Sequence, residues 1–181
     1  FLAFKESIIK AIEVAEAAHK RDGKLAGVSS GFRDLDKLLG GLHPSDLLIL
    51  AGRPAMGKTA LATNIAYNAA KDYLETNGEE GAVVGFFSLE MSSEQLAARI
   101  LSEQSNISSD RMRKGELTND EFTVVVQASQ ALHQVPMYID DTPALTVSAL
   151  RTRARRLKRQ HKLGLIIVDY LQLISGSAGS R

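Results

Sequence analysis

The sequence of 181 residues contains no cysteine, which excludes a disulfide framework and any metal site built on thiolates. Its four histidines stand far apart, without the spacing of metal ligands. No apolar run approaches the roughly 18 residues needed to span a bilayer, and the N-terminal residues lack the basic-then-apolar layout of a signal peptide. We therefore expect a cytoplasmic protein in a reducing compartment, with no membrane partner.

The sequence also lacks a large excess of charge of either sign. Its formal net charge of +1 leaves nucleic-acid binding open, because a binder of polyanions is recognised by a local basic surface more than by its total charge. The composition is that of an ordinary globular protein, with 44% hydrophobic and 24% charged residues. We expect one folded domain preceded by one helix.

The fold class is indicated by short apolar segments that alternate with helical patterns. Four segments are candidate strands: LLILA (47–51), AVVGFFS (82–88), PMYID (136–140) and LIIVD (165–169). Each is too apolar to have a face in water, which is typical of a parallel sheet covered by helices on both faces. Capping boxes at Ser92 with Gln95 and at Thr118 with Glu121 predict helix starts between the strands. The predicted class is α/β.

The segment before these strands predicts a separate helix and a linker. Apolar residues at Phe4, Ile8, Ile12 and Ala15 share one helix face, and a stretch rich in Gly, Ser and charge follows. We assign residues 1–24 to this helix and linker, and residues 25–181 to the domain. The apolar stripe can dock on its own domain or on a neighbour. A second short helix is expected before Gly40 and Gly41, because glycine readily ends a helix.

GRPAMGKT, from Gly52 to Thr59, matches the phosphate-loop pattern G-x-x-x-x-G-K-[ST] between a candidate strand and a candidate helix. In this pattern glycine lets backbone N–H groups curl round a phosphate, Lys58 neutralises phosphate oxygens and the Thr59 hydroxyl ligates Mg²⁺. The predicted ligands are therefore ATP and Mg²⁺. The predicted nucleotide-binding residues are Gly52, Arg53, Pro54, Ala55, Met56, Gly57, Lys58, Thr59 and Ala60.

Two carboxylates follow candidate strands, where open α/β sheets place their ligands. Asp169 ends LIIVD and is the candidate second anchor for Mg²⁺; the alternative is a carboxylate that only caps the strand. Glu90 follows AVVGFFS and is placed to accept a proton from the attacking water or to orient it. Its alternative role is to stabilise the next helix, because an acidic residue is favourable near a helix N-terminus.

Taken in order, these motifs resemble the ATPase domain of bacterial replicative DNA helicases of the DnaB type, within the RecA-like ATPases. The resemblance covers nearly the whole chain. It is carried most specifically by SLEMS (88–92) together with DYLQLI (169–174), since the phosphate loop and the strand aspartate are shared by many ATPases. The expected fold is accordingly a RecA-like P-loop NTPase.

The resemblance implies roles for individual residues and for partners. Lys58 matches the phosphate-loop lysine, Asp169 the Walker B aspartate and Glu90 the catalytic glutamate of the family. It also implies a homo-hexameric ring that moves 5′ to 3′ on single-stranded DNA and unwinds the replication fork, with a primase and a helicase loader as further partners and a location on the nucleoid. The leading helix is similar to the linker helix that packs on the next subunit of such a ring.

The sequence ends a dozen residues after Asp169, and this is the main departure from the family. The family continues through a sensor strand, loops that grip DNA and an arginine finger, and these are expected beyond Arg181. Residues 25–181 are therefore expected to be the N-terminal part of the domain, with its phosphate loop but without its DNA contacts. A later strand is also expected to lie between the phosphate-loop strand and the Walker B strand. Gln172 is the nearest remaining polar residue that can couple the site to DNA; a surface or core-edge role is the alternative.

Two charged segments are given structural interpretations. The basic run from Arg151 to Lys162 places Leu150, Ala154 and Leu157 on one helix face, which favours a solvated basic face over phosphate or subunit contacts. The doublet Asp140–Asp141 ends a candidate strand and is interpreted as a cap for the turn that follows.

Three functional hypotheses therefore stand beside one another. The first is a subunit of an ATP-driven replicative helicase. The second is a RecA-like recombinase or clock-type ATPase, in which SLEMS and DYLQLI are not expected together. The third is a nucleotide-binding or assembly module without catalysis, for which the piece of 181 residues alone is sufficient.

Overall fold

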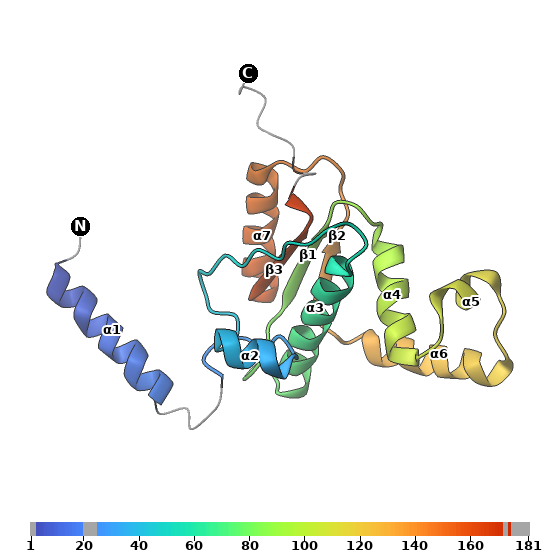
Figure 1. The fold of residues 1–181 in the computed structure, drawn as a ribbon, viewed down its shortest axis with the longest axis horizontal. Coiled ribbons are helices and arrows are strands. Elements are labelled where there is room, and N and C mark those ends of the chain that lie inside the picture. Colours follow the sequence, from blue (N-terminus) through green and yellow to red (C-terminus); the bar gives the residue numbers. More distant parts are fainter. Residues whose placement is uncertain (1–2, 20–24, 172–173, 175–181) are drawn as a thin grey trace, which may run out of the picture.

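A computed structural model describes residues 3–19, 25–171 and 174 of the chain. The described residues form helices α1 (Phe4–His19), α2 (Arg33–Leu39), α3 (Lys58–Glu75), α4 (Ser93–Ser105), α5 (Ser109–Lys114), α6 (Asn119–Leu132) and α7 (Val147–His161), and strands β1 (Val84–Ser88), β2 (Met137–Asp140) and β3 (Leu165–Asp169) (Figure 1). Within these ranges no helix combines the length and the apolar character needed to cross a membrane.

The three strands form one parallel sheet in the order β2-β1-β3. The central strand, β1, is buried along its full length. Because successive side chains of a strand point to opposite faces, Phe86 packs into a cluster with residues of α3 and α4, whereas Phe87 packs into a second cluster with residues of α7. Helices therefore cover both faces of a parallel sheet, and the predicted α/β class is confirmed.

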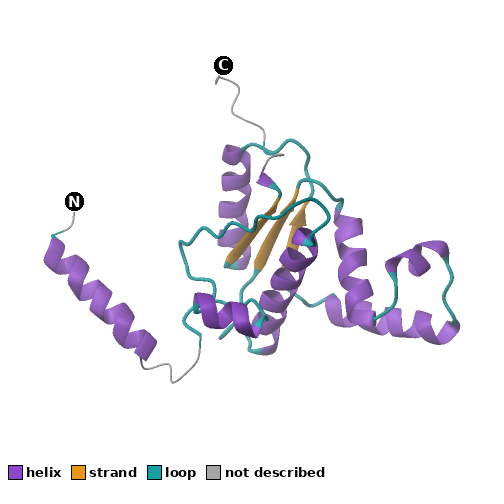
Figure 2. Ribbon diagram, viewed as in Figure 1, coloured by secondary structure: helices purple, strands orange, loops and turns teal. Residues whose placement is uncertain are grey.

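The fourth predicted strand, residues 47–51, does not form and that prediction is wrong (Figure 2). Its side chains face solvent, with Leu47 82% and Ile49 71% exposed. The physical reason is the lack of a partner: no backbone–backbone hydrogen bond among the described residues joins this segment to a strand. An apolar segment becomes a strand only when its N–H and C=O groups enter a ladder.

In the region that precedes this segment, the two ends are joined to each other and the region is attached to α3. Helix α2 ends at Gly40 and Gly41 as predicted, and both glycines have left-handed backbone, with φ of 70° and 90°. An antiparallel bridge between Val28 and Leu42 joins the two ends of the region. We call residues 27–42 the α2 unit. The unit is fixed to α3 by the Asn68 side chain, whose Nδ2 donates to the Ser30 carbonyl at 3.1 Å.

A buried carboxylate organises the interior of the α2 unit. Asp36 is 8% exposed and accepts hydrogen bonds from the Ser30 backbone N–H at 2.8 Å, the Ser30 hydroxyl at 2.7 Å and the Ser29 hydroxyl at 2.7 Å. Burial alone would raise the pKa of Asp36, but the hydrogen bonds from Ser30 and Ser29 outweigh it and lower that pKa. The ionised form of Asp36 therefore holds the start of the unit together.

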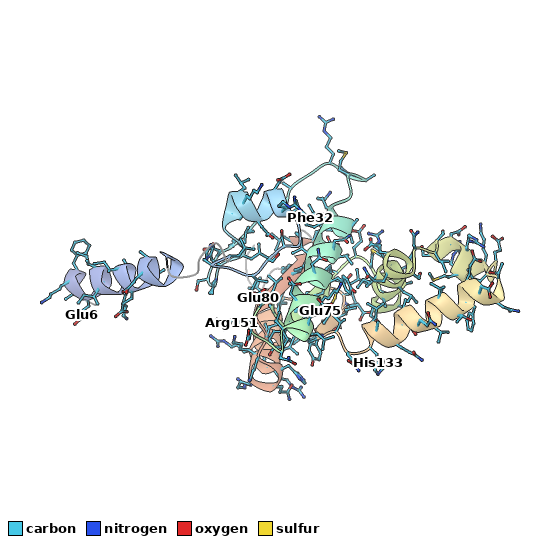
Figure 3. The ribbon with its side chains drawn as sticks, turned by 90° about the horizontal axis from the view of Figure 1, so that it is seen from below. Glu6, Phe32, Glu75, Glu80, His133 and Arg151 are labelled. Carbon is cyan, nitrogen blue, oxygen red and sulfur yellow. The ribbon has the colours of Figure 1, made fainter. Side chains whose placement is uncertain are left out.

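The leading helix α1 stands apart from the sheet and its covering helices (Figure 1). From below, Glu6 on this helix lies at one end of the molecule, far from Glu75 at the end of α3 (Figure 3). Its predicted apolar stripe is in solvent, with Phe4 80% and Ile12 60% exposed. Of the two alternatives for this stripe, docking on the chain's own domain is not observed.

The remaining helices follow the sequence closely. Both predicted capping boxes are present, at Ser92 with Gln95 and at Thr118 with Glu121. In α7 the predicted apolar stripe is confirmed, because Ala154 is buried and Leu150 and Leu157 pack against the same cluster. The opposite face is exposed along Arg151, Arg155, Arg156 and Arg159, as Arg151 illustrates in Figure 3. The basic run is therefore a solvated helix face in this structure.

Candidate active site

The phosphate loop precedes α3 in the way the motif requires. Gly57 is the residue before the helix and has φ 83°, a left-handed conformation that side chains with a Cβ adopt at a cost. The space around it is open, since a Cβ added there would meet no heavy atom within 4 Å. The free N–H groups and the positive end of the α3 dipole are therefore presented to solvent, which is favourable for binding an anion.

Lys58 begins α3 and its ammonium group reaches back across the loop. Its Nζ donates to the carbonyl of Gly52 at 2.9 Å and to the carbonyl of Arg53 at 3.0 Å. These contacts tie the first residues of the loop to the last, and phosphate oxygens of a nucleotide would compete for the same ammonium. A cavity of about 550 Å³ lies beside the loop, lined by Leu50, Ala51, Gly52, Arg53, Met56, Gly57, Lys58 and Leu61.

Asp169 lies at the end of β3, paired in register with Ser88 at the end of β1. It is 7% exposed, and its Oδ2 has no hydrogen-bond partner among the described residues. A buried carboxylate oxygen without a partner is costly unless a cation or a water completes it. The residue is therefore of the type and in the state expected of a ligand, direct or through water, for a divalent cation.

The described residues suit an Mg²⁺ ion that is bound partly by the nucleotide better than a metal ion whose ligands all come from the protein. Among the residues that the structure describes, no group of three or more His, Cys, Asp or Glu comes together. Mg²⁺ at nucleotide sites uses one or two protein oxygens besides substrate phosphates and waters. The Thr59 hydroxyl, next to Lys58 at the start of α3, and the Asp169 carboxylate are the protein oxygens that would hold it.

Glu90 lies in the loop of residues 89–92, which joins β1 to α4. Its side chain is exposed, and within the described part of the chain its carboxylate has neither a hydrogen-bond partner nor an ion-pair partner. The loop itself is fixed, because the Leu89 N–H donates to the Asp169 carbonyl at 2.8 Å and the Ser88 hydroxyl donates to the Met91 carbonyl at 2.7 Å. A free carboxylate on a fixed loop is suited to accept a proton.

These groups gather at one edge of the sheet. Strands β1 and β3 finish at the edge where α3 begins (Figure 1), so the loop before α3, the loop with Glu90 and the end of β3 with Asp169 share that edge. This is where an open α/β sheet binds ligands. Gln172, the remaining predicted site residue, lies outside the described residues.

The aspartate doublet at the end of β2 also reaches this edge, with Asp140 as the last residue of the strand and Asp141 directly after it. The sequence interpretation as a turn cap covered only one of the two side chains. Asp140 accepts from the Thr142 backbone N–H at 3.1 Å, the predicted cap of the turn. Asp141 does something different: its Oδ2 accepts from the backbone N–H of Ser93, the first residue of α4, at 2.8 Å. No local signal could have found this contact, since the two residues are 48 positions apart.

Asp140 is held in turn by α7. The Arg153 Nη1 lies 2.8 Å from Asp140 Oδ1 and 2.6 Å from Oδ2. Burial alone would raise the pKa of Asp140, but hydrogen bonds from Arg153 and Thr142 lower it. The doublet therefore connects α7, β2 and α4 through ionised carboxylates.

The family whose sequence profile matches residues 27–181 is described as the DnaB-like helicase C terminal domain. The chain is 51% identical over 176 residues to "Replicative DNA helicase DnaB" of Rickettsia bellii (strain RML369-C), covering 96% of this chain and 35% of that protein. It is 42% identical over 181 residues to "Replicative DNA helicase DnaB" of Geobacillus stearothermophilus, covering 100% of this chain and 38% of that protein. The chain thus spans little more than a third of the length of these relatives.

Solved structures show the same fold. The chain superposes on a structure described as "ATPase Domain of G40P" with a TM-score of 0.84 at 24% identity, covering 99% of this chain and 61% of that one. It also superposes on "The Structure Of A DnaB-Like Replicative Helicase And Its Interactions With Primase" with a TM-score of 0.82 at 24% identity, covering 100% of this chain and 42% of that one. The predicted RecA-like fold is therefore confirmed.

Proposed function

Because this chain belongs to the family of DnaB-like helicase C-terminal domains, we propose that it is the ATP-hydrolysing part of a replicative DNA helicase. The protein would use ATP and Mg²⁺ to move 5′ to 3′ on single-stranded DNA and to unwind duplex DNA at the replication fork. The observation that carries the proposal is that a phosphate loop, tied together by Lys58, and the buried Asp169, whose Oδ2 has no described partner, lie at one edge of the sheet.

In the proposed reaction the loop binds the substrate phosphates. The backbone N–H groups before and at the start of α3 donate hydrogen bonds to the phosphate oxygens, and Lys58 neutralises the negative charge of these oxygens. Thr59 and Asp169 hold Mg²⁺, which when bound neutralises charge on the phosphates undergoing transfer. The residues that we assign to nucleotide contact are those of the loop and the first turn of α3, from Gly52 to Ala60.

Glu90 is proposed to act on the attacking water. A positioned carboxylate can accept the proton of that water or orient it toward the terminal phosphate. Support comes from its place on a fixed loop between β1 and α4 with its carboxylate free of other described partners. Gln172 is proposed to couple this site to DNA.

The proposed assembly is a homo-hexamer joined through residues 1–24, with residues 25–181 as part of the ATPase domain. The support is the exposed apolar stripe of α1, which includes Phe4 at 80% and Ile12 at 60% exposure and which stands away from the rest of the chain. A primase is a proposed partner, because one solved structure of the same fold is described together with its primase interactions. A helicase loader and a location in the cytoplasm on nucleoid DNA complete the proposal.

The proposal is tested by measuring ATP hydrolysis and strand separation in the complete protein and in its Glu90→Gln variant. Wild-type protein should hydrolyse ATP, respond to single-stranded DNA and separate a forked duplex. Glu90→Gln should keep nucleotide affinity and lose at least about 10²-fold in turnover, the loss typical of a missing general base. The matched control is Glu94→Gln, at an exposed acidic residue in the first turn of α4. Hydrolysis without any strand separation would instead favour a RecA-like ATPase of another kind.

A further inference from the structure

We propose that Asp141 is a positioning residue for Glu90. Its carboxylate fixes the first residue of α4 and so fixes one end of the loop that carries Glu90. The inference rests on the proposed function, since it assumes that Glu90 serves ATP hydrolysis. It adds to the site a positioning residue that directly follows another strand of the sheet, β2, and that touches neither nucleotide nor water.

The contact lies where the start of a helix needs an acceptor. The first four N–H groups of a helix have no partner within the helix. In α4 the Ser92 hydroxyl accepts from the Gln95 N–H, and the Gln95 side chain accepts from the Ser92 N–H. The Ser93 N–H is left over by this capping box, and Asp141 Oδ2 accepts it at 2.8 Å. Hydrogen bonds from the Ser93 backbone and side chain lower the pKa of Asp141, so it is ionised at neutral pH.

The other end of the Glu90 loop is fixed by different groups. The Leu89 N–H bonds to the Asp169 carbonyl at 2.8 Å, so the residue before Glu90 is attached to β3. The buried Ser88 hydroxyl bonds to the Met91 carbonyl at 2.7 Å, which closes the loop round Glu90. On the α4 side, the Asp141 carboxylate reaches Ser93, the residue that directly follows the loop, while the buried Leu96 packs the body of α4 against the core. Removing this carboxylate would leave the Ser93 N–H next to the loop without its acceptor, while β1, β3 and the packed body of α4 stay in place.

Asp141 is itself exposed, but the residues on both sides of it are fixed by Arg153 of α7. The preceding residue, Asp140, is paired with Phe87 of β1 in the sheet and is gripped by both contacts of Arg153 from α7. Arg153 also donates to the Thr142 hydroxyl at 2.6 Å, on the other side of Asp141. Side chains supported by packed elements hold a catalytic group more accurately than free loops do. The path therefore runs from α7 through Asp141 to α4 and Glu90.

A simple helix cap would stabilise α4 without acting on Glu90, and enzyme kinetics separate the two roles. In the complete protein, Asp141→Ala should lower kcat for ATP about tenfold, within the loss of up to about 10²-fold that a 1 Å misplacement can cause. KM for ATP should change less than about twofold, because the phosphate loop is untouched. Asp141→Asn should restore most of kcat, since its amide oxygen can accept the same bond. The control Asp120→Ala removes an exposed acid from the first turn of α6 and should leave kcat unchanged.

A second variant removes the donor in place of the acceptor. Ser93→Pro deletes the N–H that Asp141 accepts, at the first helical position where proline is well tolerated. It should reproduce the kcat loss of Asp141→Ala, with melting temperatures recorded for each variant. In a Glu90→Gln background, Asp141→Ala should cost less than about a further twofold, because there is no carboxylate left to position and the two effects are coupled.

Each outcome decides the matter. Unchanged kcat in both Asp141→Ala and Ser93→Pro would overturn the inference while leaving the proposed function intact. The inference would also be overturned if Asp141→Ala lowered kcat a further tenfold in the Glu90→Gln background, or if Asp141→Asn had as low a kcat as Asp141→Ala. A rise in KM for ATP without a loss of kcat in Asp141→Ala would overturn it as well. A wild-type protein without ATP hydrolysis would overturn the proposed function, and the inference with it.

Discussion

The two halves of the candidate site are built in opposite ways. The carboxylate side, comprising β1, β3 and the loop with Glu90, is centred on a strand that is buried along its length and paired on both edges. The phosphate side, residues 43–59, is exposed through its segment 47–57. It is held by the contacts of Lys58 within the loop and by the α2 unit on α3.

This difference separates what the core holds from what local chemistry holds. On the carboxylate side, the positions of Asp169 and Glu90 follow from register and packing, so disturbing the core should disturb them. On the phosphate side, the loop follows from a left-handed glycine, a helix start and one lysine, so changes there should affect substrate more than stability.

Phe86→Ala should be the most damaging change to the carboxylate side. Phe86 is fully buried on β1 and packs between the sheet and helices α3 and α4. Its removal should lower the free energy of unfolding by about 3–5 kcal/mol through lost burial and a residual cavity. Urea unfolding measures this, with Phe122→Ala as control, since Phe122 is 59% exposed on α6. Equal losses at the two positions would contradict a core centred on β1.

Lys58→Ala should have the reverse profile on the phosphate side. Removing the ammonium should lower turnover of ATP by about 10²–10³-fold, the loss seen when one charge-stabilising donor is removed from an active site. The melting temperature should change little, because the contacts of the Lys58 ammonium within the described chain are with two loop carbonyls and are exposed to solvent. The control is Lys71→Ala on the same helix, where the ammonium pairs with Glu75 at 3.7 Å on the surface. Normal turnover in Lys58→Ala would remove the lysine from the proposed mechanism.

How far the sequence predicts this molecule depends on the range of each interaction. The capping boxes at Ser92 and Thr118 join residues three positions apart and were predicted correctly, as was the end of α2 at Gly40. The apolar segments gave three strands correctly and a fourth, residues 47–51, wrongly. An apolar run shows that burial is favourable, but it does not say whether a neighbouring strand is present to pair with it.

The candidate site divides in the same way. The phosphate loop and the two carboxylates are placed by motif at the ends of predicted elements, so their common edge could be predicted from parallel topology. The support of Glu90 could not be predicted. It depends on the Leu89 bond to Asp169 and on the Ser93 bond to Asp141, which join segments far apart in the chain. That Asp169 Oδ2 is buried without a described hydrogen-bond partner likewise follows only from the packing of the strands.

Asp36→Asn should weaken the anchorage of the phosphate side by a smaller amount. Replacing a carboxylate oxygen with an amide nitrogen that donates should cost about 1–3 kcal/mol, because a donor of the buried Ser30 or of the half-buried Ser29 loses its acceptor. The lowered pKa of Asp36 fixes the pH dependence. Its contribution is full above the ordinary value of 3.8 and is lost as pH falls through the lower folded value.

The measurement is urea unfolding of both proteins at pH 7 and at several values below pH 4. The difference between wild type and Asp36→Asn should be constant near neutrality and should shrink in the acid range, where Asp36 of the wild type becomes protonated. A difference that grows as pH falls would contradict a lowered pKa. The control is Asp34→Asn, an exposed acidic residue in the first turn of the same helix, which should change the free energy of unfolding at pH 7 by no more than about 0.5 kcal/mol.

The smallest effect should come from Ile49→Thr, compared with the same type of change at Val84 in β1. Val84 is fully buried, so a hydroxyl placed there without a partner should cost about 1–3 kcal/mol. Ile49 is 71% exposed in a segment without a described strand partner, so its replacement should stay within about 0.5 kcal/mol. Unfolding of the two variants under one condition measures the contrast. A loss at Ile49 as large as that at Val84 would mean that the segment is paired in solution, and the phosphate side would then be held by the sheet as firmly as the carboxylate side.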